Sequence, residues 1–264
     1  MKCIFCKADS TDSVSIEHVI PESLGNKDTV LPRGAVCDKC NNYFAVKIEK
    51  EVLSSGEFTA ARYHQSIESK KGRLPEMKIL IDGIPVASRH HGNFEFSLSP
   101  DDYDKVEMKL SHSNHGVMYI PISGAPPKNH IMSRFLAKMA LEALAHRWCD
   151  QKGWNEYLVS HKQLDAIRNF ARFPKRDEEW LFSKRRICGE NEPQKAEDGN
   201  YYQILNEWDI LVTGGIDDSE FYFVIAIFGV EYAINLAGNS IDGYLKWLRN
   251  NGQKSPLYID KRNA

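Results

Sequence analysis

Apolar and polar residues alternate over many short stretches of the chain, and this alternation is typical of half-buried strands. The strands that it predicts are residues 14–20, 35–36, 77–86 as a hairpin, 94–98, 106–110, 117–122, 201–212 and 221–236. Apolar residues at three- and four-residue spacing predict helices over residues 42–54, 131–148, 157–173 and 241–248. Short strands and separate helices together indicate an α+β fold.

Two of these expectations rest on strong local signals. The segment 131–148 contains neither glycine nor proline, and Phe135 and Met139 recur at helical spacing within it. In the segment 77–86, Asp82 and Gly83 stand between two apolar runs, which is a common sequence for a tight hairpin turn. We therefore expect a long helix and a β-hairpin at these two places.

The chain of 264 residues is long enough for one or two domains. Ser54, Ser55 and Gly56 form a plausible joint after the first predicted helix. We expect an N-terminal unit over residues 1–55 and an α+β domain of mixed short strands and helices over residues 56–264. A unit as small as the first lies near the lower limit for a free-standing hydrophobic core, so additional stabilisation is expected there.

The composition is that of an ordinary globular protein, with 42% apolar residues. An unbroken apolar run of about 18 residues, which a membrane span needs, does not occur. The first residues carry no apolar leader segment, so we expect the chain to remain in a reducing cytoplasm. Such a compartment disfavours disulfides between the six cysteines.

Charge is distributed unevenly, although the net charge is only -2. Residues 134–186 contain 12 Lys or Arg against 7 Asp or Glu, whereas residues 187–264 contain 6 against 12. This asymmetry fits a basic nucleic-acid face with an acidic counterpart elsewhere. It fits two solvated surfaces equally well, and the sequence leaves both interpretations open.

Four of the six cysteines form two close pairs near the N-terminus. They are Cys3, Cys6, Cys37 and Cys40, and each pair has the spacing Cys-x-x-Cys. Two such pairs can supply a tetrahedral thiolate site for structural zinc. The alternative, two unrelated redox-active pairs, normally accompanies a βαβ pattern that is missing here. We expect the zinc to hold a loop of 30 residues, while the isolated Cys149 and Cys188 are small buried residues.

The loop between the cysteine pairs contains the dipeptide Glu17-His18. A histidine can act as a general base near neutral pH, and a carboxylate is a ligand that Mg²⁺ or Mn²⁺ prefers. Adjacent strand residues point to opposite faces of a sheet, so Glu17 and His18 can serve one site only where the strand ends or bulges. Pro21, shortly after them, indicates that the strand ends there. Asn41 and Asn42 follow the last cysteine, and either could also cap the next helix.

These residues resemble the HNH, or ββα-metal, endonuclease motif in its four-cysteine variant. The resemblance covers about a fifth of the chain and rests on order, spacing and residue type together. It implies that His18 is the general base, that Glu17 binds the catalytic Mg²⁺ or Mn²⁺, and that Asn41 completes the metal site. Asn42 is the neighbouring candidate for the last role.

One position departs from the pattern of that family. The family has an Asn about five residues before the third cysteine, and Pro32 occupies this place here. The Asn normally braces the loop that carries the histidine. Asn26 or a backbone carbonyl is the substitute that we expect.

The resemblance implies hydrolysis of phosphodiester bonds. We hypothesise that the substrate is double-stranded DNA and that the protein acts in restriction or antiviral defence. The sequence does not distinguish DNA from RNA as the substrate, and it does not decide whether the protein forms a homo-oligomer. The alternative from another class is a non-catalytic zinc ribbon that binds nucleic acid or protein. Loss of cleavage in the His18→Ala variant would separate the two.

Overall fold

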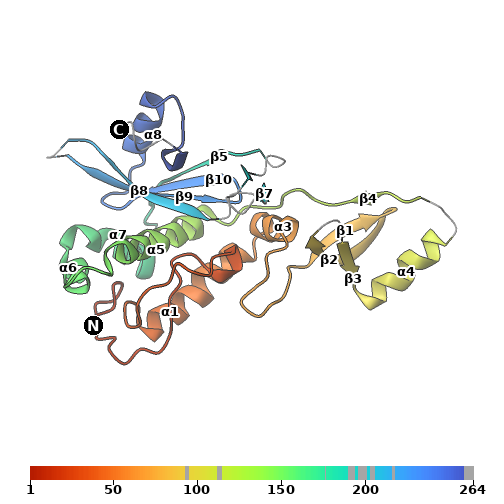
Figure 1. Ribbon diagram of the computed structural model, residues 1–264, viewed down its shortest axis with the longest axis horizontal. Coiled ribbons are helices and arrows are strands. Elements are labelled where there is room, and N and C mark those ends of the chain that lie inside the picture. Colours follow the sequence, from red (N-terminus) through yellow and green to blue (C-terminus); the bar gives the residue numbers. More distant parts are fainter. Residues whose placement is uncertain are drawn as a thin grey trace. The chain divides into compact units, whose positions relative to one another are not determined.

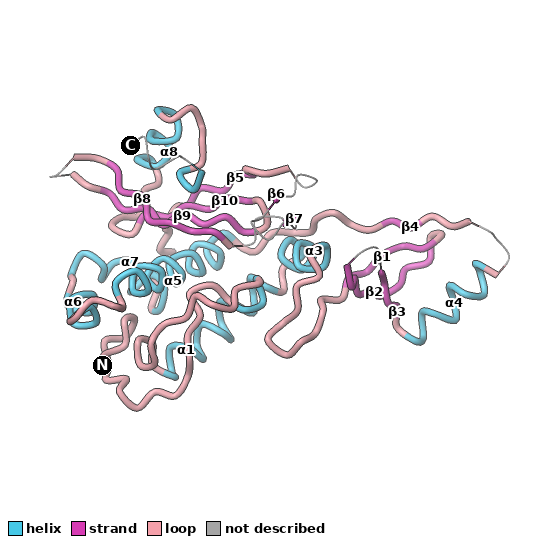
Figure 2. Tube along the Cα trace, in the orientation of Figure 1, coloured by secondary structure: helices cyan, strands magenta, loops and turns pink. Residues whose placement is uncertain are grey.

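In the computed structural model, the described residues are 1–92, 95–111, 115–175, 177–189, 194–195, 201–202, 206–215 and 218–258. The chain forms two compact units (Figures 1 and 2). Unit 1 consists of residues 1–21, 26–50 and 128–264, and unit 2 of residues 22–25 and 51–127. These units do not follow the expected boundary at residue 55, because residues after 128 pack with the N-terminal segment. Whether residues 1–55 act as the functional module stays a prediction.

Helix α5 (Asn129–Trp148) lies at the centre of unit 1, and its residues from Met132 to Ala145 are all buried. A helix that is buried on every side must be covered by several elements. Those that pack against it are α6 (Trp154–Ser160), α7 (Asp165–Arg172), strand β10 (Val230–Asn235) and the π-helical turn η2 (Ala45–Glu49). The helix predicted over residues 131–148 is confirmed.

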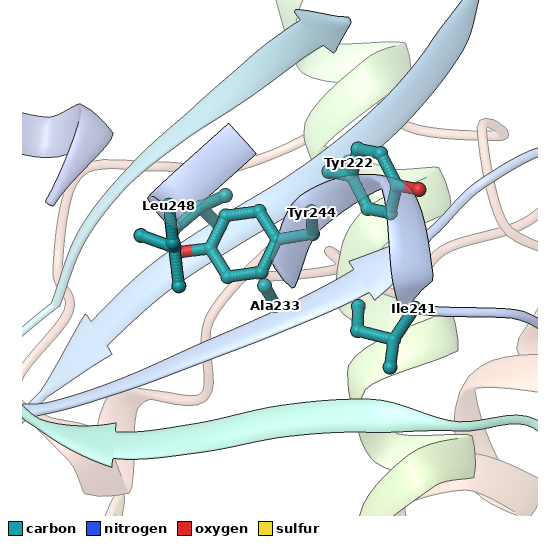
Figure 3. Close-up of a cluster of buried hydrophobic side chains, with 6 residues drawn as sticks. Tyr222, Ala233, Ile241, Tyr244 and Leu248 are labelled. Atoms are coloured by element: carbon teal, nitrogen blue, oxygen red, sulfur yellow. The ribbon is translucent and has the colours of Figure 1, made fainter. Parts of the chain in front are cut away.

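An antiparallel sheet of order β5-β10-β9-β8 completes unit 1. Its other strands are β5 (Phe182–Arg186), β8 (Glu207–Thr213) and β9 (Glu220–Ile227). α5 covers one face, and α8 (Asp242–Asn250) lies on the other, where Tyr244 packs beside Tyr222 (Figure 3). The expected strand 221–236 is a hairpin of β9 and β10, since Phe228 and Gly229 both have positive φ, as a type I′ turn requires.

Three other expected elements of unit 1 differ from the structure in their bounds. The helix expected over residues 157–173 is interrupted at His161, whose extended backbone leads into the 3-10 turn η3 (Lys162–Leu164) and then α7. Of the strand expected over residues 201–212, residues 203–205 lie outside the described part. The remainder is β7 (Tyr201–Tyr202), which pairs with β6 (Gln194–Lys195), and β8. The expected helix 241–248 is α8, and the 3-10 turn η4 (Pro256–Tyr258) follows it.

Unit 2 contains an antiparallel sheet of order β3-β2-β1-β4. Its strands are β1 (Met77–Ile81), β2 (Ile84–Gly92), β3 (Glu95–Leu98) and β4 (Met118–Tyr119). Asp82 and Gly83 have φ of 47° and 80° and connect β1 to β2, so the predicted hairpin is confirmed. Helices α3 (Gly56–His64) and α4 (Pro100–Leu110) supply Tyr63 and Val106 to the small apolar core.

The strand expected over residues 106–110 is wrong, because these residues form the second half of α4. Pro100 stands at the start of the helix, where its missing N–H costs nothing, and Asp101 and Asp102 lie in the first turn, where acidic residues are favourable. The alternation that suggested a strand therefore reflects one buried position, Val106, in an otherwise exposed helix.

The N-terminal segment also contains less strand than expected. Residues 14–20 form a loop with one isolated antiparallel bridge between His18 and Val30, and residues 35–36 lie outside any strand. The backbone N–H groups of Val14 and Ser15 donate to the carboxylate of Asp38 instead of to a neighbouring strand. A short 3-10 turn, η1 (Glu22–Leu24), follows the loop.

The helix expected over residues 42–54 begins earlier, at the second cysteine pair. It runs without a break through α1 (Asp38–Phe44), η2 and α2 (Lys50–Leu53). Cys37 occupies the N-cap position, so the expectation that Asn41 or Asn42 caps the helix is wrong. Both asparagines lie within α1.

Two side chains from the later part of unit 1 fasten the N-terminal segment. Asn155 of α6 accepts from the N–H of Lys2 at 2.9 Å and donates to its carbonyl at 2.8 Å, as a paired strand would. Arg168 of α7 donates from Nε to the carbonyl of Ile4 at 2.6 Å and from Nη2 to the carbonyl of Leu158 at 2.8 Å. These bonds explain why the first residues belong to the same compact unit as α6 and α7.

Candidate functional site

The four paired cysteines converge, as the sequence predicts. Their Sγ atoms all lie within 4.8 Å of one another, and Cys3 and Cys40 are buried. Each pair is set by a tight turn, in which the N–H of Lys7 donates to the carbonyl of Cys3 and the N–H of Cys40 donates to that of Cys37. Four sulfur ligands at this separation fit a tetrahedral zinc ion.

The electrostatics of the cluster also favour a cation. A hydrogen bond with the Cys40 thiol lowers the pKa of Cys3 to about 5, and the same contact raises the pKa of Cys40. The contact between these two thiols therefore favours a thiolate at Cys3. Ionisation of all four thiols needs a divalent ion at their centre, because a coordinating thiol loses its proton to the metal.

A cationic side chain from α7 lies beside the cluster. The guanidinium of Arg172 stacks on the ring of Tyr43, with its central carbon 3.7 Å from the ring centroid, and its presence opposes the rise in the pKa of the Cys40 thiol. Arg172 lines an open groove of about 540 Å³ together with Cys6 and Cys37. A positive charge at this point would offset the excess negative charge that four thiolates carry around one divalent ion.

Side-chain hydrogen bonds hold the loop between the cysteine pairs. Asn26 is buried, donates to the carbonyl of Ile20 at 2.7 Å and accepts from the N–H of Thr29 at 3.1 Å. The N–H of Leu31 donates to the carbonyl of Glu17 at 2.9 Å. Asn26 thus braces the two sides of the loop from a position other than residue 32, and Pro32 itself is exposed.

The predicted catalytic residues fall on this braced loop and on α1. His18 is half-buried, and its backbone bridges to Val30. Asn41 is half-buried too, and its Nδ2 donates a long hydrogen bond of 3.5 Å to the carbonyl of Ile16. The amide of Asn41 therefore lies beside the residue that precedes Glu17, whereas Asn42 lies on the exposed side of α1.

Glu17 is buried, with 8% of its side chain exposed, and its partner comes from the centre of unit 1. Its Oε1 lies 2.6 Å from Nζ of Lys138 in α5. The same ammonium contacts Glu49 of η2 at 2.9 Å and Glu142 of α5 at 2.8 Å. We call Glu17, Glu49, Lys138 and Glu142 the lysine cluster.

Burial opposes the charge of Lys138, but the three carboxylates outweigh it and raise the pKa of Lys138 well above its usual value. Burial raises the pKa of Glu142 well above the ordinary value of a carboxyl group. The Lys138 ammonium lies in contact with the carboxyl groups of Glu17, Glu49 and Glu142, which stabilise its charge inside the core.

The lysine cluster was missed at the sequence level, although α5 contains a signal for it. Arg134, Lys138 and Glu142 recur at four-residue spacing in a helix that is otherwise apolar. Charged residues on the same face of a buried helix need partners. The sequence could have identified Lys138 as a paired residue, but not the residues that pair with it.

Comparison with known families identifies the N-terminal segment. A family model described as HNH endonuclease matches residues 3–55. No curated protein and no solved structure matches the chain. Within the described residues, no helix is long and apolar enough to cross a membrane.

Proposed function

We propose, from the match of residues 3–55 to the HNH endonuclease family, that the chain is a metal-dependent endonuclease that hydrolyses phosphodiester bonds of double-stranded DNA. The observation that carries this proposal is the convergence of four cysteine thiols at the two ends of the loop that contains Glu17 and His18, together with the hydrogen bond from Asn41 of α1 to the carbonyl of Ile16 in that loop. A half-buried imidazole at this position is accessible, unlike one packed inside the core.

The four-cysteine cluster would hold structural zinc. Its donor set is purely thiolate, and its sulfur atoms already lie close enough to share one ion. Such a site leaves no ligand position for a substrate, so its contribution is to fix the loop. The zinc would thereby keep the Glu17-His18 dipeptide in register with α1.

Glu17 and Asn41 would bind the catalytic Mg²⁺ or Mn²⁺, with Asn42 as the neighbouring alternative to Asn41. Their oxygen donors suit a hard cation. The bound ion would stabilise negative charge on the phosphate as the transition state develops. His18 would accept the proton of the attacking water, which needs a neutral imidazole.

The remaining parts of the chain would choose and position the substrate. Residues 56–264 contain no catalytic motif that we recognise, so we assign them to substrate selection or regulation. We also propose that the protein acts in the cytoplasm. Its proposed role in restriction or antiviral defence rests on analogy with effectors that join an HNH nuclease to a second domain. RNA is the alternative substrate, and the cleavage assay with RNA in place of the plasmid distinguishes the two.

The second candidate function is a non-catalytic zinc ribbon that binds nucleic acid or protein. Two observations favour it: Pro32 stands where the family has an asparagine, and the carboxylate of Glu17 is engaged by Lys138. This candidate predicts that the His18→Ala variant still binds its nucleic-acid or protein partner as wild type does.

The test is plasmid cleavage by the full-length chain with Mg²⁺ or Mn²⁺. The His18→Ala variant should lose nicking, while His161→Ala, which changes another half-buried histidine of unit 1, should retain it. Equal zinc content in both variants shows that the four-cysteine cluster is intact. Equal nicking by wild type and His18→Ala would refute the assignment of the base.

A further inference from the structure

The lysine cluster connects the predicted nuclease loop to a helix that begins more than 70 residues after the end of the family match. Lys138 is fully buried and contacts three carboxylates from three elements: the loop (Glu17), η2 (Glu49) and α5 itself (Glu142). A shared contact of this kind fixes the loop relative to both helical elements. Displacing α5 would leave the buried carboxylate of Glu17 without its ammonium.

Simple packing does not require an ion at this place. The neighbours of Lys138 along α5 are apolar, including Ala137 and Met139, which are 0% exposed. Apolar side chains in place of Lys138 and all three of its partners would pack at least as well, because a buried ion pair usually stabilises a protein no more than apolar residues of similar size. The presence of an ammonium at this buried position is therefore better explained by its effect on the orientation of its carboxylate partners.

Of those partners, Glu17 is the one in the predicted catalytic site. It immediately precedes His18, and the carbonyl of Ile16 before it accepts from Asn41. A carboxylate can accept hydrogen bonds on both oxygens, so contact between Oε1 and Lys138 is compatible with metal binding by the same group. Partners that hydrogen-bond a metal ligand set its orientation, and losing one typically weakens metal binding about 10- to 100-fold.

We propose that Lys138 is a positioning residue of the nuclease site, which holds the carboxylate of Glu17 in the orientation that binds the catalytic Mg²⁺ or Mn²⁺. This inference rests on the proposed function, because it takes Glu17 as a metal ligand. It adds a residue outside the matched segment to the site. It also makes α5 a part of the catalytic apparatus, and not only the core of unit 1.

The test measures Mn²⁺ binding directly, by electron paramagnetic resonance on the zinc-loaded full-length chain. Lys138→Met combined with Glu49→Gln removes the ammonium together with one carboxylate, so that the net charge of the lysine cluster does not change. Glu49→Gln alone is its reference. Glu231→Gln is the matched control, since it changes a buried carboxylate of β10 that pairs with Arg185 and lies outside the lysine cluster.

We expect Mn²⁺ to bind about 10- to 100-fold more weakly to Lys138→Met/Glu49→Gln than to Glu49→Gln, and Glu231→Gln to bind it as wild type does. Zinc content and thermal unfolding establish that each variant is folded. Equal Mn²⁺ affinity in the double variant and its reference would overturn the proposal. So would wild-type affinity in Glu17→Gln, a result that does not depend on whether any Lys138 variant folds.

The outcome separates this inference from the proposed function. If Mn²⁺ binding weakens as expected but no variant or wild type shows cleavage that depends on His18, the positioning role stands and the nuclease assignment fails. If cleavage depends on His18 but the Mn²⁺ affinity is unchanged in the Glu17 and Lys138 variants, the nuclease assignment stands. Glu17 is then only an anchor for the loop.

Discussion

Arg168→Met is the perturbation that most directly tests how the N-terminal segment is held. Arg168 is 1% exposed, and its guanidinium donates to the carbonyls of Ile4 and Leu158. Ile4 lies between the first two cysteines, so this bond fixes the first knuckle against α7. The methionine side chain would keep most of the apolar stem of arginine and remove every donor.

The magnitude follows from the contacts that are lost. A hydrogen bond from a charged donor contributes about 1.5–3 kcal/mol, and two buried carbonyls lose such a donor here, which gives about 3–6 kcal/mol. The ion pair with Asp165 adds little, about 0–1 kcal/mol, because that carboxylate is 38% exposed. We expect a total loss of about 3–6 kcal/mol in the free energy of unfolding.

The assay is urea unfolding of the zinc-loaded chain, followed by far-UV circular dichroism. Arg147→Met is the control, since the ion pair of Arg147 with Asp209 lies at the surface and should contribute less than about 1 kcal/mol. A loss in Arg168→Met no larger than that of the control would refute the reasoning. The first knuckle would then be held by zinc alone.

Three further predictions concern the loop, the metal and unit 2. Asn26→Ala removes the buried brace of the loop and should cost about 1–3 kcal/mol, measured as a lower unfolding midpoint; an unchanged midpoint would mean that zinc holds the loop alone. Chelation of zinc should make residues 7–36 the first sites of limited proteolysis, and an identical digestion pattern with and without zinc would contradict this. The N–H of Ala87 donates to Asp102 and is the main reason that the pKa of Asp102 is lowered from 3.8 to about 2. Because the folded pKa is the lower one, this stabilisation is complete above the unfolded pKa and is lost as pH falls towards 2, so Asp102→Asn should flatten the pH dependence of unfolding in that window, and an unaltered slope would exclude this role.

The features that the sequence predicts correctly depend on local chemistry. The two Cys-x-x-Cys pairs converge because each turn is set by its own residues and one ion can hold both. The β1–β2 hairpin forms around Asp82 and Gly83 because these residues tolerate positive φ. Helix α5 follows from apolar residues at helical spacing in a segment without glycine or proline.

The features that the sequence does not predict depend on partners far along the chain. Residues 14–20 alternate like a strand, but Asp38 takes the N–H groups that a neighbouring strand would need. Lys138 is recognisable as a charge on a buried helix, yet its pairing with Glu17 joins residues 121 positions apart. The roles of His18, Glu17, Asn41 and Asn42 stay predictions, because they concern a metal ion and a phosphate.

The bonds from Asn155 to Lys2 and from Arg168 to Ile4 bear on protein engineering. Excision of residues 1–55 as a transplantable cassette would strip the first knuckle of these anchors and deprive Glu17 of its ammonium. A chimaera built on this chain should therefore carry residues 128–172 along with the nuclease-like segment. In this protein the segments 1–21 and 26–50 form one compact unit with residues 128–264, so a transplanted N-terminal segment needs its later partners to fold correctly.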